Sequence, residues 1–149
     1  FYAIDRYTSY LEDWGKEYNN GGLIIADRYT TSNAVHQSAK MPRDDRYPYF
    51  RWLVDTEYGR MGIPEPDLVI YLDMPLEATE KLMRKREAST DTKADIHEKD
   101  LTYLAQCKEA AKDAALYYGW HIIECAKDGE PRTIEDISEE VYRFVQSYL

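Results

Sequence analysis

LIIADRYTTSNAVHQ, residues 23–37, joins a continuous apolar run to a charged pair and a polar segment. The run at residues 23–26 is typical of a strand covered on both faces in an open α/β sheet. Asp27 and Arg28 follow it directly. Because ligands in such sheets bind beyond the carboxyl ends of the strands, we expect this pair at a binding site. An acid there can orient a metal ion or its waters, and a guanidinium can bind a phosphate through two donors.

The rest of the chain alternates between helical and strand patterns. Apolar side chains spaced by three or four predict helices, with a loop at residues 41–45 and Pro48 tolerated in the first turn of the helix that follows. The predicted helices span residues 1–18, 30–39, 45–60, 76–86 and 97–118, and a last one is capped by Thr133. Apolar runs predict further strands at residues 68–72 and 120–125. This alternation indicates βαβ units and a parallel sheet with right-handed crossovers, in a single α/β domain over residues 1–149.

Length, charge and cysteine content restrict the class of protein. A chain of 149 residues is long enough to bury a core. Its net charge of -9 argues against a general nucleic-acid binder, because phosphate backbones attract basic surfaces, whereas a mononucleotide needs only a local basic cluster. Cys107 and Cys125 lack metal-ligand spacing, so we expect two buried thiols and no metal site. No apolar run approaches the ~18 residues of a membrane span and no signal peptide is visible, which predicts a cytoplasmic protein without membrane contact.

The segment DRYTTSNAVHQ resembles the signature motif of the thymidylate kinase family. In that motif, Asp-Arg-Tyr or Asp-Arg-His is followed by a serine five residues after the aspartate, and then usually by Tyr-Gln. The matching residues are Asp27, Arg28, Tyr29, Ser32 and Gln37. His36 stands where the family usually has tyrosine or phenylalanine, and this departure leaves the identity of the acceptor base open.

Three flanking segments resemble the same family. Residues 1–6, FYAIDR, are similar to a segment whose arginine holds the monophosphate and whose aromatic residue lies against thymine. By position, Arg6 takes the phosphate role and Tyr2 the stacking role. On the residues alone, Tyr2 is equally well an aromatic at the edge of the core, and Arg6 a solvated helix residue.

The other two similar segments lie after the middle of the chain. Residues 66–75, PDLVIYLDMP, resemble the family's proline-aspartate strand, and residues 82–86, LMRKR, resemble the start of the lid that closes over the triphosphate. The resemblance implies a lid-like segment at residues 84–97, with Arg84 and Arg86 as candidate catalytic residues. Their alternate spacing places them on different faces of a helix, so only one need point at a phosphate, and a solvated helix end is the alternative.

The family's P-loop, G-x-x-x-x-G-K-[ST], is absent from this sequence. In the family the P-loop strand is the middle of a five-stranded sheet. The resemblance therefore implies a three-layer αβα parallel sheet of the P-loop nucleotide kinase type, with the first two strands, including the central one, missing from this chain. The chain also starts inside a helical pattern without an initiator methionine, so we expect it to be the C-terminal part of a longer kinase.

The resemblance implies phosphoryl transfer from ATP to dTMP, giving dTDP, with Mg²⁺ as the metal cofactor. Arg6 and Arg28 would clamp the acceptor phosphate, and Asp27 would place that phosphate or a water of the magnesium ion. The remaining candidates would line the acceptor pocket: Ser32, His36 and Gln37.

Two other functions stay open at this point. One is a deoxynucleoside kinase or another nucleoside-monophosphate kinase of the same P-loop group. The other is a catalytically inactive domain that binds a nucleotide or a partner. Family members are commonly homodimers, and aromatic residues at positions 47–52 would suit either an interface or a core.

Overall fold

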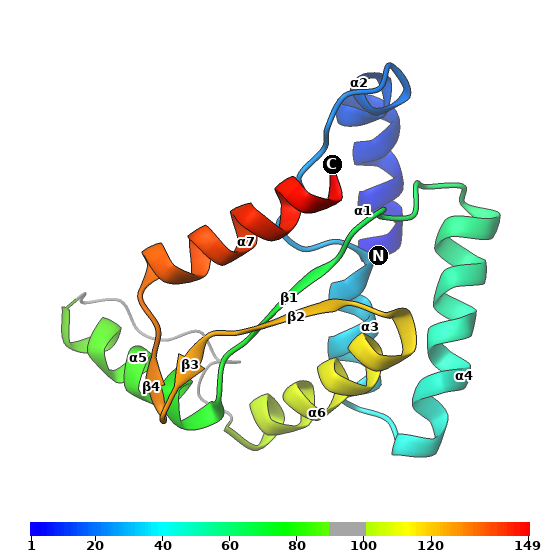
Figure 1. Ribbon diagram of the computed structural model, residues 1–149. Helices are drawn as coiled ribbons and strands as arrows, with labels where there is room; N and C mark the ends of the chain where they lie inside the picture. The colour runs from blue at the N-terminus through cyan, green and yellow to red at the C-terminus, as the bar shows by residue number, and fades with distance from the viewer. Residues whose placement is uncertain (90–100) are drawn as a thin grey trace.

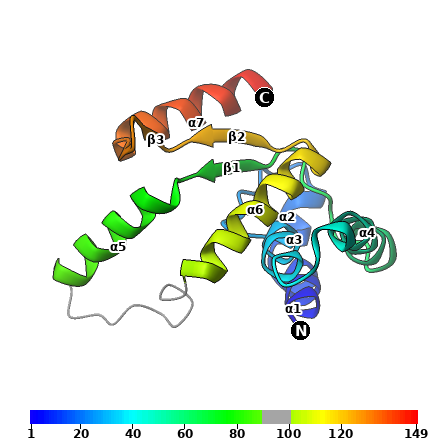
Figure 2. The same cartoon turned by 90° about the horizontal axis from the view of Figure 1, so that it is seen from below.

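The computed structural model describes the backbone of residues 1–89 and 101–149, and the side chains of residues 1–84 and 101–149. Two parallel strands lie between helix α7 (Ile134–Tyr148) on one face and helices α3 (Thr30–Ser38) and α6 (Leu101–Tyr118) on the other (Figures 1 and 2). Helix α4 (Arg43–Val54) packs against α3 and α6 at the outer side of this assembly. In the described residues no helix has the length and apolarity needed to cross a bilayer.

The first helical segment is continuous but changes its winding. α1 (Tyr2–Ser9) leads into a π-helical turn, η1 (Tyr10–Trp14), and then into α2 (Gly15–Asn19). A Cβ atom at Gly15 would lie 2.2 Å from the carbonyl oxygen of Tyr10, so the wide turn can close only on a glycine. The helix predicted at residues 1–18 is confirmed, but the periodicity gave no sign of the π turn.

The helix predicted at residues 45–60 begins earlier than expected. α4 starts at Arg43 and continues through a second π-helical segment, η2 (Asp55–Arg60), so the loop expected at residues 41–45 is shorter than predicted. Pro48 consequently lies inside the helix, beyond its first turn. Its missing N–H leaves the Asp44 carbonyl without a helical partner, which is tolerated because Asp44 and Pro48 are both on the exposed face.

Two of the three predicted strands form and are parallel as expected. β1 (Ile70–Asp73) pairs with β2 (His121–Glu124), with Ile70 opposite His121 and Asp73 opposite Glu124. α5 (Leu76–Ser89) follows β1, and Thr133 caps α7 by accepting a hydrogen bond from the Asp136 amide at 3.1 Å. The helices predicted at residues 76–86 and after Thr133 are therefore confirmed. Helix α6 confirms the helix predicted at residues 97–118 from residue 101 onward.

The prediction of a strand at residues 23–26 is wrong, because the structure has no strand there. The segment is extended, but it pairs with neither strand of the described sheet, and Leu23 and Ile25 are 66% and 87% exposed. An apolar run becomes a strand only when a neighbouring strand accepts its hydrogen bonds, and this one has no such neighbour among the described residues. Conversely, a small antiparallel hairpin of β3 (Ala126–Lys127) and β4 (Glu130–Pro131) was not predicted.

The main core lies between α3, α4 and α6. The buried residues Ala34, Phe50, Leu53 and Ala114 form one cluster, covered by three aromatic side chains: Tyr49, Tyr118 and Trp120. Small alanines on α6 let it approach α3 closely, and a buried ion pair of 2.7 Å between Arg46 and Asp113 joins α4 to α6. This packing fixes the position of α3, which directly follows the segment at residues 23–29.

Candidate functional site

Arg28 has an unusual backbone conformation at the start of α3. Its φ of 70° lies in the left-handed region, which residues with a side chain adopt rarely. This conformation directs the Arg28 side chain along the first two turns of α3. Its Nε donates to the Ser32 hydroxyl at 3.0 Å, and its Nη2 lies 3.0 Å from Nε2 of His36. Ser32 and His36 are four residues apart on one face of α3, and Arg28, which precedes the helix, contacts both of them. The structure therefore brings together three residues that the sequence predicted.

His36 connects this group to α6. Its Nδ1 lies 3.3 Å from the Tyr103 hydroxyl and 3.5 Å from the Cys107 thiol, and the His36 and Tyr103 rings stack at a centroid distance of 6.3 Å. Burial raises the pKa of Tyr103 to about 12 and also raises the pKa of the Cys107 thiol. Both groups are therefore neutral at neutral pH. The sequence did not predict either residue at the site, because 67 or more positions separate them from His36.

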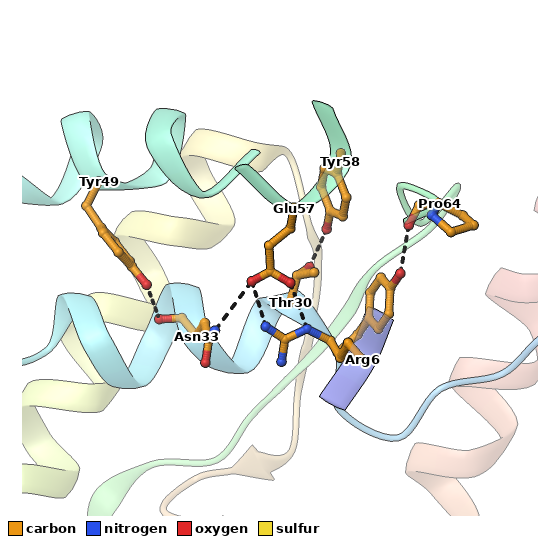
Figure 3. A network of polar contacts seen from close by, with 8 residues as sticks. Arg6, Thr30, Asn33, Tyr49, Glu57, Tyr58 and Pro64 are labelled. Carbon is orange, nitrogen blue, oxygen red and sulfur yellow. Dashed lines mark hydrogen bonds and ion pairs between the residues drawn. The ribbon is translucent and has the colours of Figure 1, made fainter. Parts of the chain in front are cut away.

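Arg6 is held by an acid that the sequence did not predict at the site (Figure 3). Its Nε and Nη2 donate to the two carboxylate oxygens of Glu57 at 2.8 and 2.6 Å, and Glu57 is only 1% exposed. Asn33 of α3 donates to the same carboxylate at 3.4 Å. Glu57 falls on the same helical stripe as Phe50 and Leu53, which is the signal by which its burial could have been found.

Further contacts around Glu57 fix the start of α3 (Figure 3). The Tyr29 hydroxyl donates to the Pro64 carbonyl at 2.9 Å, and Thr30 is hydrogen-bonded to the Tyr58 hydroxyl. The Tyr49 hydroxyl donates to the Asn33 carbonyl at 3.4 Å. Burial raises the pKa of Tyr29 well above its usual range, so this tyrosine stays a neutral donor. Tyr29 therefore anchors the Asp27-Arg28 segment from its inner side.

In the described residues, Asp27, Tyr2, Gln37 and Arg84 make no side-chain hydrogen bond or ion pair with the Arg28 group. Asp27 and Tyr2 are exposed and Gln37 is half-buried, and among the side chains of residues 1–84 and 101–149 none makes a hydrogen bond or ion pair with these three. Arg84 is on α5, with 81% of its side chain exposed and a 3.6 Å ion pair to Glu80. Helix α5 extends away from α3 (Figures 1 and 2). The side chain of Arg86 and the rest of the lid-like segment at residues 84–97 lie outside the described side chains.

A second polar group lies at the carboxyl end of β1. Lys108 of α6 donates to Asp73 at 2.7 Å and to the Met74 carbonyl at 2.9 Å, and Lys112 lies 4.0 Å from the same carboxylate. Lys108 follows Cys107 directly, so α6 connects this ion pair with the His36 group. Within the described part of the chain, no three carboxylate, histidine or cysteine side chains are grouped so that they could hold a metal ion.

A cavity of about 450 Å³ is separate from the predicted site. It lies at the amino ends of β1 and β2, and its walls include Thr30, Tyr58, Trp120 and Phe144. The residues that line this cavity do not include Arg6, Arg28, Ser32 or His36. Arg28 itself is exposed, and Ser32 and His36 are half-buried.

The known proteins to which this chain is similar belong to a single family. The family model for thymidylate kinase matches residues 1–138. A thymidylate kinase of Mycobacterium tuberculosis is 29% identical over 79 residues, which are 52% of this chain and 37% of that protein. A probable thymidylate kinase 1 of Saccharolobus solfataricus is 25% identical over 140 residues, 92% of this chain and 61% of the relative. A probable thymidylate kinase of Pyrobaculum aerophilum is 26% identical over 145 residues, 97% of this chain and 67% of the relative.

The matched part of the chain thus spans between 37% and 67% of the length of these relatives. The family match, in contrast, covers nearly all of the chain itself and includes the segment with Arg28, Ser32 and His36. The chain belongs to the thymidylate kinase family, which has the P-loop α/β class of fold.

Proposed function

We propose that the full-length protein transfers a phosphoryl group from ATP to dTMP and so produces dTDP. The observation that carries this proposal is the orientation of Arg28 by Ser32 and His36, in a chain that belongs to the thymidylate kinase family. Transition states of phosphoryl transfer are loose, so the work of the protein is to position the reactants and to neutralise their charge. A guanidinium already held in one orientation suits that work.

Arg28 is the proposed main contact to the acceptor phosphate. Its N–H groups toward Ser32 and His36 are used within the protein, and its other terminal N–H groups remain available for a phosphate. Arg6 is the second proposed contact, although Glu57 compensates most of its charge. We therefore expect Arg6 to act as an oriented donor through Nη1, which points away from Glu57, and Arg28 to supply most of the positive charge (Figure 3).

The remaining predicted residues keep their proposed roles. Tyr2 would stack on the base, and Gln37 would offer a donor and an acceptor to a base edge. Residues 84–97, with Arg84 and Arg86, would form the lid over the donor phosphates. The proposal includes a homodimer as the assembly and the cytoplasm as the location.

ATP and Mg²⁺ would be held mainly by residues outside this chain. The sequence has no P-loop motif, and the described residues contain no group of three or more carboxylate, histidine or cysteine side chains that could hold a metal ion. Mg²⁺ supplies charge neutralisation on the donor phosphates when it is bound. Asp27, exposed at the end of the extended segment, would orient one of the waters of the ion.

We further propose that two strands precede this chain and complete a three-layer parallel sheet. Among the described residues, no strand pairs with the extended segment at residues 23–26, and one edge of β1 has no partner strand. A strand inserted between them would satisfy both sets of hydrogen bonds and cover Leu23 and Ile25. This supports a domain of which residues 1–149 are the C-terminal part.

An acceptor panel tests the function. Full-length protein with ATP and Mg²⁺ is offered dTMP, dUMP, dCMP and thymidine, and product formation is followed by chromatography. We expect dTMP to be the preferred acceptor. Phosphorylation of thymidine but not of dTMP would show a deoxynucleoside kinase instead, and binding of dTMP without phosphorylation would show an inactive nucleotide-binding domain.

A further inference from the structure

We propose that His36 is a positioning residue that, as the neutral tautomer protonated at Nδ1, holds the Arg28 guanidinium ready for the acceptor phosphate. This inference rests on the proposed function and adds to it the way in which the acceptor site is organised. Its starting point is the 3.0 Å contact between Arg28 Nη2 and His36 Nε2.

The chemistry of the two side chains determines the tautomer. A guanidinium only donates hydrogen bonds, so Nε2 of His36 has to accept, and an imidazole nitrogen accepts only when it carries no proton. The ring proton of neutral His36 therefore lies on Nδ1. On that side the Tyr103 hydroxyl at 3.3 Å and the Cys107 sulfur at 3.5 Å are both able to accept it. Helix α6 thus stabilises the tautomer that Arg28 requires.

The contact restricts an otherwise free side chain. Arg28 is exposed, and an exposed arginine samples many rotamers, whose loss on ligand binding weakens affinity. Ser32 holds Nε and His36 holds Nη2, so both ends of one edge of the guanidinium are fixed on α3. The left-handed backbone at Arg28 makes this geometry reachable. Much of the ordering entropy is then lost before the ligand arrives.

Protonation of His36 would reverse the effect. A second proton places an N–H on Nε2, directly opposite a permanently charged guanidinium, and the acceptor is lost. The charged and titratable groups facing the ring in the described residues are Arg28 from the segment before α3, and Tyr103 and Cys107 from α6, with Lys40 near Cys107. The tyrosine and the thiol remain neutral while a histidine titrates, so affinity for the acceptor falls as the pH decreases.

Three variants of the full-length protein separate this role from a structural one. His36→Phe removes the acceptor for Arg28, whereas His36→Gln keeps an amide oxygen in reach but cannot titrate. His121→Gln is the matched control, because His121 stacks on Phe144 at the start of β2, away from Arg28. For each protein we would measure kcat and the KM for dTMP between pH 5.5 and 8, and the midpoint of thermal unfolding.

At pH 7.5 we expect His36→Phe to raise the KM for dTMP about tenfold, the loss expected for one hydrogen bond to a charged group, with kcat changed less than about twofold. His36→Gln should keep a KM near that of the wild type. Toward pH 5.5 the KM of the wild type should rise relative to that of His36→Gln, by about fivefold or more. Because the phosphate of dTMP titrates equally in both assays, this ratio reports His36 alone.

A second readout does not depend on activity. The ¹⁵N shifts of the histidine rings, with His36 assigned by its loss in His36→Gln, should show the Nδ1–H tautomer at pH 7.5. An Nε2–H tautomer, or a KM in His36→Phe equal to that of the wild type at every pH, would overturn the inference and leave the proposed function standing. A wild-type protein that neither binds nor phosphorylates dTMP would overturn the proposed function, and the tautomer would still decide whether His36 holds Arg28.

Discussion

At Arg28, an unfavourable backbone angle and two side-chain hydrogen bonds occur in the same residue. The left-handed conformation costs about 1–2 kcal/mol for a residue with a Cβ atom. The hydrogen bonds to Ser32 and His36 offset part of this cost. Backbone strain that the surrounding structure maintains is found preferentially at functional sites. The conformation of Arg28 therefore agrees with a role in binding rather than with a solvated surface residue.

Replacement of Arg28 tests that role. We expect Arg28→Ala in the full-length protein to lower kcat/KM for dTMP by about a hundredfold or more, because a charged phosphate loses at least two hydrogen bonds. Arg28→Lys should have a kcat/KM between those of the wild type and Arg28→Ala, since an ammonium group cannot contact Ser32, His36 and a phosphate in one plane. Steady-state kinetics measures both effects, with Arg143→Ala as control, because Arg143 is exposed and its partner among the described residues is Glu139 on the same helix, α7. Unchanged kinetics in Arg28→Ala would remove this residue from the site.

Glu57 gives a prediction on stability. Its carboxylate is buried against Arg6, so Glu57→Gln leaves a poorly compensated charge and should lower the free energy of unfolding by about 3 kcal/mol. Urea denaturation measures this change. The double variant Arg6→Leu/Glu57→Leu removes both charges and should recover part of the loss. A Glu57→Gln protein as stable as the wild type would show that the pair is not formed in solution.

Among the elements, those with local signals were predictable. The helical period of 3.6 residues depends only on nearby side chains, so α3, α6 and α7 were predicted from the sequence. The motif that contains Arg28, Ser32 and His36 was recognised there too, but the contacts among these three side chains were not predicted. The hairpin β3–β4, which was not predicted, also has a local signal: the Asp128-Gly129 turn with positive φ at both residues. The segment at residues 23–26 was mispredicted because strand formation depends on a partner that the local pattern does not contain. Tyr103 and Cys107 contact His36 through tertiary packing alone, whereas the helical stripe shared with Phe50 and Leu53 gives a local signal for the burial of Glu57.

The packing of α4 on α6 leads to a pH prediction. Burial would raise the pKa of the Asp113 carboxyl, but hydrogen bonds from Arg46 and Arg43 outweigh burial and hold it below its ordinary value. A lowered pKa in the folded state stabilises the fold above the unfolded pKa of about 3.9, and this stabilisation disappears as the pH falls through the folded value. Asp113→Asn should therefore cost about 3 kcal/mol at pH 7 and progressively less below pH 4.

Urea denaturation at a series of pH values measures the Asp113 effect. Asp55→Asn is the matched control, because Asp55 forms an exposed ion pair with Arg60 and should change the free energy of unfolding by less than about 0.5 kcal/mol. A loss in Asp113→Asn that stays constant down to pH 2 would contradict an ionic contribution and indicate a packing defect instead.

For the whole molecule, the small sheet is the feature that the proposed longer domain has to explain. Within the part of the chain that the structure describes, β1 and β2 each have one edge without a partner strand. Apolar side chains are exposed on these strands and on the extended segment: Leu23, Ile25, Leu72 and Ile122. Parallel sheets are normally covered on both faces and paired at their central strands. Exposed apolar side chains next to unpaired backbone groups therefore favour a further strand over a complete sheet.

Hydrogen exchange tests this arrangement directly. In the full-length protein the amides of residues 24–26 and of β1 should exchange slowly, because a strand between them would bind both edges. When residues 1–149 are produced alone, the same amides should exchange at least about a hundredfold faster, while α6 amides that bond within the helix keep more of their protection. Equal protection in both proteins would show that the two-stranded sheet is sufficient and that no strand is inserted beside β1. The same conclusion would follow if the protein isolated from its natural source had a mass of 17.5 kDa and unfolded cooperatively.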